Sequence, residues 1–307
     1  MPARKTLSWL TAVRSYKGYL EGTGKSKHTI SSYLSDVRLF GVYLTQHSVQ
    51  NAGKEIKLPD LKVLTAQNLD EYGAFLKAEG QRINTRRRKL LSVRRFLKFL
   101  GSRKKVSDGL GARLPAPHKH EVLPYAPDFN EVRRFLLQSE VRDAREARDQ
   151  ILIWTLLETG CLVSEVSTIG VQAALSRGEI EVLDKEGVAR HIPISSQYAE
   201  ALENYQDSLP QHQKTLFLGW NRHGPFTERM SPRGVELVVK QFSRKFDQPH
   251  LTPRSLRHAA VLEWMKEGVS STEIQRRLGL KSDYAFRIYD SLFKSKTQTT
   301  ATEGASP

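Results

Sequence analysis

The sequence lacks the features that mark secreted or membrane-spanning proteins. Its 307 residues include one cysteine, Cys161, which excludes an intramolecular disulfide. No apolar run approaches the roughly 18 residues that cross a bilayer. Residues 1–20 mix charges with isolated apolar positions, which is not the pattern of a signal peptide. These absences predict a protein of a reducing bacterial cytoplasm or nucleoid. The apolar neighbours of Cys161 favour a buried small hydrophobe, with a nucleophile as the alternative.

Acidic residues are scarce in the first third of the chain. Residues 1–108 hold 22 Lys and Arg against 8 Asp and Glu, a net charge of +14. The remaining 199 residues hold 26 Lys and Arg against 25 Asp and Glu, a net charge of +1. Charge concentrated in this way predicts a nucleic-acid-binding domain joined to a nearly neutral domain. A membrane surface is the alternative anionic partner, but the basic residues interleave with core-like patterning and form no strongly amphipathic helix.

Apolar residues recur at helical spacing throughout this basic third. Gly22 and Gly24 end the first helical stretch, and Thr65 and Thr85 have the residue type that caps a helix N-terminus. The pattern predicts a four-helix domain over residues 1–108. Its four helices are expected at residues 7–21, 29–46, 64–78 and 85–100.

Helix-breaking residues separate this domain from the rest of the chain. Residues 109–127 contain two glycines and four prolines, which predicts an extended linker. A mixed α+β domain is expected over residues 128–294, and a Ser- and Thr-rich tail over 295–307 is expected to be disordered.

The second domain is predicted to hold helices around one β-hairpin. The hairpin has strands at 179–183 and 188–194, joined by the turn Asp184-Lys185-Glu186-Gly187. The helices are expected at residues 129–138, 144–159, 197–209, 231–246, 256–268, 271–278 and 284–293.

One block near the C-terminus contains candidate catalytic residues. The segment Thr252-Pro253-Arg254-Ser255-Leu256-Arg257-His258 is followed by Tyr289, 32 residues after Arg257. With the basic helical domain, the linker and the hairpin lysine, this order resembles the tyrosine recombinase (phage integrase) family. The resemblance covers about residues 7–293. It implies a mainly α fold with a small β-sheet: a SAM-like, four-helix core-binding domain and a C-terminal mixed α+β catalytic-type domain that close on double-stranded DNA.

The resemblance also implies a set of roles. In the family a tyrosine attacks a DNA phosphate, and two arginines stabilise the charge that develops on its oxygens. A hairpin lysine protonates the leaving oxygen, a histidine assists the tyrosine, and neither metal nor cofactor is needed. By position, Tyr289 matches the nucleophile, Arg257 the second arginine and Lys185 the hairpin lysine.

Three family positions are substituted in this chain. In the segment 156–166, which resembles the first arginine block, Leu162 stands where the arginine is expected. Arg254 replaces a histidine, and Leu280 replaces a histidine or tryptophan. Leucine cannot donate to a phosphate, and arginine cannot act as a base near neutral pH. A shifted register would offer Arg145 or Arg148 in place of the missing arginine.

The DNA-binding residues are predicted from the basic segments of the first domain. Some of these charges cannot share one helix face and are expected to be merely solvated. The predicted contacts are Lys25, Lys27, His28, Arg86, Arg87, Arg88, Arg94, Arg95 and Lys98, with Arg276 and Arg277 as further contacts near the site.

Two functional hypotheses follow, with a third less supported. The first is a catalytically impaired family member that binds DNA as an accessory, architectural or regulatory factor. The second is an active site-specific recombinase that uses Tyr289 with a divergent phosphate clamp. The third is a protein-interaction module that self-associates through the C-terminal helix and tail.

Overall fold

The computed structural model describes residues 9–47, 64–114, 116–118, 123–173, 178–221, 223–280, 286 and 289–293. The chain divides into two compact units, Met1–Glu121 and Val122–Pro307. Helices dominate both units, and the second also holds two small antiparallel sheets. The predicted fold class is therefore confirmed. Across the described ranges, no helix has the length and apolarity needed to cross a membrane.

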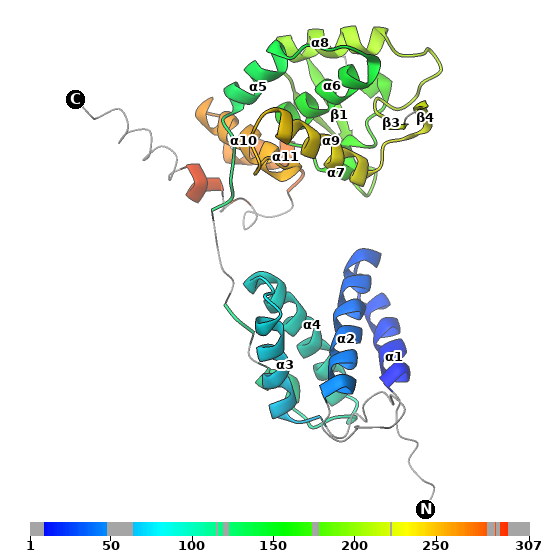
Figure 1. Ribbon diagram of the computed structural model, residues 1–307, viewed down its shortest axis with the longest axis vertical. Helices are drawn as coiled ribbons and strands as arrows, with labels where there is room; N and C mark the ends of the chain where they lie inside the picture. Colours follow the sequence, from blue (N-terminus) through cyan, green and yellow to red (C-terminus); the bar gives the residue numbers. More distant parts are fainter. Residues whose placement is uncertain are drawn as a thin grey trace, which may run out of the picture. The chain divides into compact units, whose positions relative to one another are not determined.

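The N-terminal unit is a bundle of four helices around an aromatic core (Figure 1). The ring of Trp9 packs edge-on against Phe40 and Phe96, at centroid distances of 6.0 and 5.4 Å. The ring of Tyr72 lies 4.8 Å from that of Phe40. These rings help to explain how so basic a segment folds, because each large buried aromatic contributes much apolar area to the core. The helices are α1 (Trp9–Glu21), α2 (Lys27–His47), α3 (Ala66–Ala78) and α4 (Ile83–Gly101).

The predicted helix starts are correct in one case and wrong in two. Thr65 caps α3 as expected, since its hydroxyl accepts from the Asn68 amide. Thr85 is not a cap, because α4 already begins at Ile83 and the Arg86 amide donates to the Arg82 carbonyl at 3.0 Å. Helix α2 begins two residues earlier than predicted. There the Ser26 hydroxyl accepts from the Thr29 amide at 3.2 Å.

The segment predicted as a linker folds in part onto the N-terminal unit. The 3-10 turn η2 (Leu110–Arg113) packs on α4, and Leu110 and Leu114 are buried. Gly111 allows this close approach, because a Cβ there would lie 2.8 Å from the Arg94 carbonyl oxygen.

The C-terminal unit is built around α6 (Ala144–Thr159), which is buried from Ile151 to Thr159. Its mostly apolar second half fits a helix that neighbours cover on every side. The helices packed against it are α5 (Phe129–Gln138), α8 (Ser196–Asp207), α9 (Pro232–Lys245) and α10 (Pro253–Lys266) (Figure 1). The short α7 (Val163–Val166) follows α6, and α11 (Ser271–Leu278) follows α10.

The predicted hairpin forms, and a second one was missed. Strands β1 (Glu179–Leu183) and β2 (Ala189–Pro193) pair with Ile180 opposite Ile192. The second hairpin joins β3 (Leu218–Asn221) to β4 (Gly224–Arg229). Of the last predicted helix, residues 289–293 are helical, residues 284, 285, 287 and 288 lie outside the described residues, and so does the predicted tail.

The contact between α1 and α2 depends on Gly41. A Cβ at this position would lie 2.6 Å from the Trp9 indole, closer than real contacts allow. Gly41→Ala is expected to lower the free energy of unfolding by roughly 1 to 3 kcal/mol, because the core is overpacked there. Gly73→Ala on α3 is the matched control, since its Cβ would meet nothing within 4 Å. The control is expected to be neutral or stabilising by up to about 1 kcal/mol. Equal urea midpoints for the two variants would contradict this packing.

Candidate functional site

A groove of about 1090 Å³ in the C-terminal unit contains five of the six catalytic-type positions singled out in the sequence. Its walls come from the start of α7, from α9, from the start of α10 and from residues after α11. The five positions are Leu162, Arg254, Arg257, Leu280 and Tyr289.

Arg257 is fixed at the inner wall of the groove. It is buried, and its guanidinium donates to the Gly160 carbonyl at 2.6 Å and to the Leu278 carbonyl at 2.9 Å. Gly160 ends α6 with φ +58, a left-handed conformation that turns its carbonyl toward Arg257. Two of the five guanidinium N–H groups are used in this way, so three remain for a ligand.

Leu162, where the family resemblance expects an arginine, lines the groove. Its side chain is 49% exposed, although its neighbour Cys161 is buried. Its backbone amide donates to the Glu165 carboxylate at 2.8 Å, which fixes the loop. A large aliphatic side chain held half in solvent supplies no hydrogen bond to an anion.

An ion pair behind this loop joins three segments of the site. Arg190 of β2 donates to both carboxylate oxygens of Glu165, at 2.9 and 2.8 Å, and to the Arg277 carbonyl at 2.8 Å. Both side chains of the pair are less than one tenth exposed. The loop of Leu162, the first hairpin and the end of α11 therefore share one rigid support. The sequence analysis did not identify this pair.

Arg254 and Leu280 complete the mouth of the groove. Arg254 is exposed in the first turn of α10, whose N-cap Thr252 accepts from the Ser255 amide at 3.0 Å. This helix begins three residues earlier than predicted, because Pro253 is favourable in a first turn. Leu280 is half-buried and packs against the core of the unit.

His258 also lies in the groove, although the sequence alone gave it no predicted role. It is 3% exposed, lines the groove, and its ring lies 5.3 Å from that of Tyr289. Within the described residues, neither ring nitrogen has a hydrogen-bond partner. Burial, followed by the positive charges of Arg254 and Arg257, lowers the pKa of His258 from 6.5 to about 4. The imidazole is therefore neutral at pH 7.

The pKa of His258 makes stability depend on pH. Between pH 6.5 and 4 the unfolded chain takes up a proton at this position and the folded chain does not. The free energy of unfolding is therefore expected to fall by roughly 2 to 3 kcal/mol over that window as pH is lowered. In urea titrations, His258→Phe should remove this part of the pH dependence. Exposed His212→Phe is the control and should keep it. An unchanged pH dependence in His258→Phe would show that the histidine does not titrate in this way.

Three predicted positions lie away from the groove. Lys185 is exposed in the turn of the first hairpin and pairs with Glu186 at 3.3 Å. Arg148 is buried, pairs with Asp149, and lies 5.4 Å from the Trp220 ring. Arg145 and Arg148 line a different hollow, beside β4 and the start of α9. The shifted register that would place one of them in the groove is therefore wrong.

Arg276 and Arg277 are engaged within the unit. Both pair with Glu273, at 2.7 and 3.0 Å. These hydrogen bonds, led by the one from Arg276, lower the pKa of Glu273 to about 2. The one carboxylate thus compensates one of the two positive charges. Cys161 is buried, and burial raises the pKa of its thiol to about 12, as a structural cysteine requires.

Several basic residues of α4 form ion pairs or hydrogen bonds within the N-terminal unit. Arg88 pairs with the buried Asp36. Arg87 donates to the Pro117 carbonyl, and Arg94 donates to the carbonyls of Gly111 and Ala112. Arg95 donates to the Tyr33 hydroxyl, and the buried Arg86 Nε has no partner among the residues that the structure describes.

Four of the predicted DNA contacts are exposed and, among the described residues, have no side-chain partner. They are Lys25, Lys27, His28 and Lys98. The first three surround the start of α2. Lys25 precedes the helix, whereas Lys27 and His28 lie in its first turn and not before it, which corrects the prediction.

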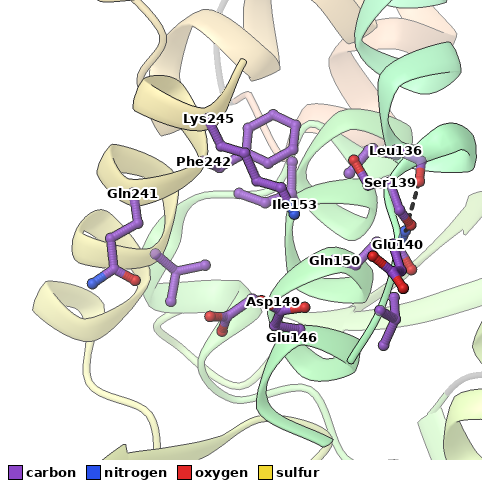
Figure 2. Close-up of a pocket in the computed structure, with 12 residues that line it drawn as sticks. Leu136, Ser139, Glu140, Glu146, Asp149, Gln150, Ile153, Gln241, Phe242 and Lys245 are labelled. Carbon is purple, nitrogen blue, oxygen red and sulfur yellow. Dashed lines mark hydrogen bonds between the residues drawn. The ribbon is translucent and has the colours of Figure 1, made fainter. Parts of the chain in front are cut away.

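A second hollow of about 160 Å³ lies between α5, α6 and α9 (Figure 2). Its rim carries the carboxylates of Glu140, Glu146 and Asp149 against one cation, Lys245. An acidic rim repels phosphate, so this hollow is not an alternative nucleic-acid site. In the part of the chain that the structure describes, no group of His, Cys, Asp and Glu is arranged to hold a metal ion.

Two family models match the chain. The one described as the phage integrase family matches residues 128–296, and the N-terminal SAM-like domain of phage integrases matches residues 13–104. Among similar proteins, the tyrosine recombinase XerD of Shewanella oneidensis is 25% identical over 281 residues, 90% of this chain and 89% of the relative. XerC of Staphylococcus carnosus is 28% identical over 259 residues, 83% of each chain.

Solved structures share the fold at low identity. A lambda integrase dimer bound to a COC' core site gives a TM-score of 0.66 at 17% identity, covering 91% of this chain and 76% of that one. XerH recombinase bound to difH substrate gives a TM-score of 0.64 at 17% identity, covering 85% of this chain and 76% of that one.

Proposed function

Because this chain belongs to the phage integrase family of tyrosine recombinases, we propose that it binds duplex DNA but cleaves it very slowly or not at all. It then acts in the bacterial cytoplasm as an accessory, architectural or regulatory factor. Relatives described as bound to core-site or difH DNA support the choice of partner. A relative described as a dimer supports self-association.

One observation carries the proposal of impaired cleavage. Leu162 lies half-exposed in the groove, where the family resemblance expects an arginine. Among the described residues, the only arginines lining the groove are Arg254 and Arg257. Losing one donor to a developing oxyanion costs about 10²–10³ in rate. Leu162 and Leu280 each remove one, so the combined loss is on the order of 10⁵, although residues that act as a unit are not strictly additive.

The second candidate function is an active recombinase that uses Tyr289. It is favoured by the position of Tyr289 in the same groove as Arg257 and by the neutral His258 ring beside it. The relatives' description as tyrosine recombinases also supports it. The two functions differ in one product, a covalent protein–DNA adduct.

DNA binding is tested by its salt dependence. The free lysines at the start of α2 can meet a phosphate together with the helix N-terminus. Removing Lys25 and Lys27 with alanine is expected to weaken duplex binding about tenfold near 0.1 M salt and to flatten the log–log salt slope by about 2. Lys17→Ala is the control, because Glu21 already compensates that charge at 3.5 Å. Duplex binding that is absent, or independent of salt, would overturn the proposal.

A further inference from the structure

The groove around Arg257 has a largely aliphatic wall. Its apolar lining residues come from four separate segments and include Leu162, Val163, Val239, Pro249, Leu251 and Leu280. Its volume of about 1090 Å³ is at the upper end of the range for pockets that hold small organic molecules. A site that contacts only a phosphate group has no need for such a wall.

Leu162 is an exposed part of this wall. Almost half of its side chain is exposed, and it stands at a concave surface rather than on an open one. A ligand that covers Leu162 and Leu280 removes apolar area from water, which is the main favourable term in binding to such pockets.

Two cations stand at the rim without partners. Lys240 of α9 and Arg254 of α10 are exposed, and no described residue forms an ion pair or hydrogen bond with either side chain. Glu236 also lines the groove, but it pairs with Arg233 at 2.8 Å. The uncompensated charge of the rim is therefore positive and selects a negatively charged ligand group.

His258 adds a polar group at the inner wall. It is more than nine-tenths buried, and both ring nitrogens lack partners in the part of the chain that the structure describes. A buried polar group without a hydrogen bond is unfavourable, so a polar ligand atom that reaches the ring is stabilised there.

We propose that this groove binds a small amphipathic carboxylic acid. Its apolar body covers Leu162 and Leu280, and its carboxylate lies between Lys240 and Arg254. Such a ligand occupies the groove in which the proposed function places a DNA phosphate, so it competes with duplex DNA. Only this competition rests on the proposed function.

The test uses the full chain without DNA and the fluorescent probe 1-anilinonaphthalene-8-sulfonate, an aromatic anion. We expect a dissociation constant on the order of 10 µM and displacement of the probe by decanoate. Leu162→Ser and Leu280→Ser should each weaken probe binding by about tenfold, and Lys240→Gln with Arg254→Gln should weaken decanoate binding by about tenfold. Leu183→Ser and Lys214→Gln are matched controls outside the groove. They should change neither probe binding nor decanoate binding.

Three results would overturn the proposal: no probe binding, equal weakening in the controls, or equal displacement by decanol and decanoate. Competition is measured separately as the shift in duplex affinity with decanoate. If the affinity for duplex DNA does not change with decanoate, the ligand does not compete with DNA. Absence of any duplex binding would instead contradict the proposed function, and the probe titration would still decide the ligand site.

Discussion

Restoring the three family residues together, with Leu162→Arg, Arg254→His and Leu280→His, is expected to raise the rate of covalent DNA attachment through Tyr289 by at least about 10⁴-fold. Two of the changes return hydrogen-bond donors to the phosphate, each with an effect of about 10²–10³. The third replaces a permanent cation with an imidazole, which can transfer a proton. The Leu162 loop is already held by Glu165 and Gly160, so an arginine there starts from a fixed backbone.

The measurement is a single-turnover assay on a nicked duplex selected by the chain from a random pool. The adduct is resolved by denaturing electrophoresis. The restored variant that also carries Tyr289→Phe is the control and should form none. Restored cleavage that persists without Tyr289 would assign the nucleophile elsewhere. No gain in the restored variant, with duplex binding intact, would show that the three substitutions do not explain impaired cleavage.

The second large effect concerns the ion pair behind the groove. Arg190→Met leaves the Glu165 carboxylate buried without its partner, which is expected to cost about 3 to 5 kcal/mol of unfolding free energy in the C-terminal unit. The same change frees the loop of Leu162 from the end of α11, since Arg190 also donates to the Arg277 carbonyl. Urea unfolding followed by circular dichroism measures the loss.

An exposed pair on α9 gives the matched control. Arg233 and Glu236 lie at 2.8 Å, but their side chains are 75% and 47% exposed. Arg233→Met is expected to cost about 0 to 1 kcal/mol, because solvent screens the pair. In the double variant Arg190→Met with Glu165→Leu, much of the loss should be recovered, since no buried charge remains. A cost at Arg190 as small as that at Arg233 would mean the pair does not support the site.

The sequence predicted the architecture well where patterns were long. Apolar spacing located most of the helices, and alternation located the hairpin that pairs Ile180 with Ile192. It missed β3 and β4, which are short and are interrupted by a register shift. It placed the start of α10 too late, although Thr252-Pro253 is a typical N-cap and first-turn pair.

Site residues were harder to predict than the fold. Arg257, Tyr289 and the substituted Leu162 were singled out by their match to family positions, and all three line one groove. Arg190 and Glu165, the pair behind the Leu162 loop, come from different segments of the chain, and spacing alone does not reveal such a contact. Net charge also did not reveal that several basic residues of α4 have partners within the N-terminal unit. There Arg88 neutralises Asp36, and Arg94 fixes the segment after the helix.

The proposed function requires that the groove of the C-terminal unit holds DNA without cleaving it. The most direct measurement is covalent trapping by the unmodified chain on the nicked duplex, at a salt concentration where binding is saturated. The predicted result is a bound complex with no covalent adduct over hours. A prompt adduct that disappears in Tyr289→Phe would contradict the claim and establish an active recombinase.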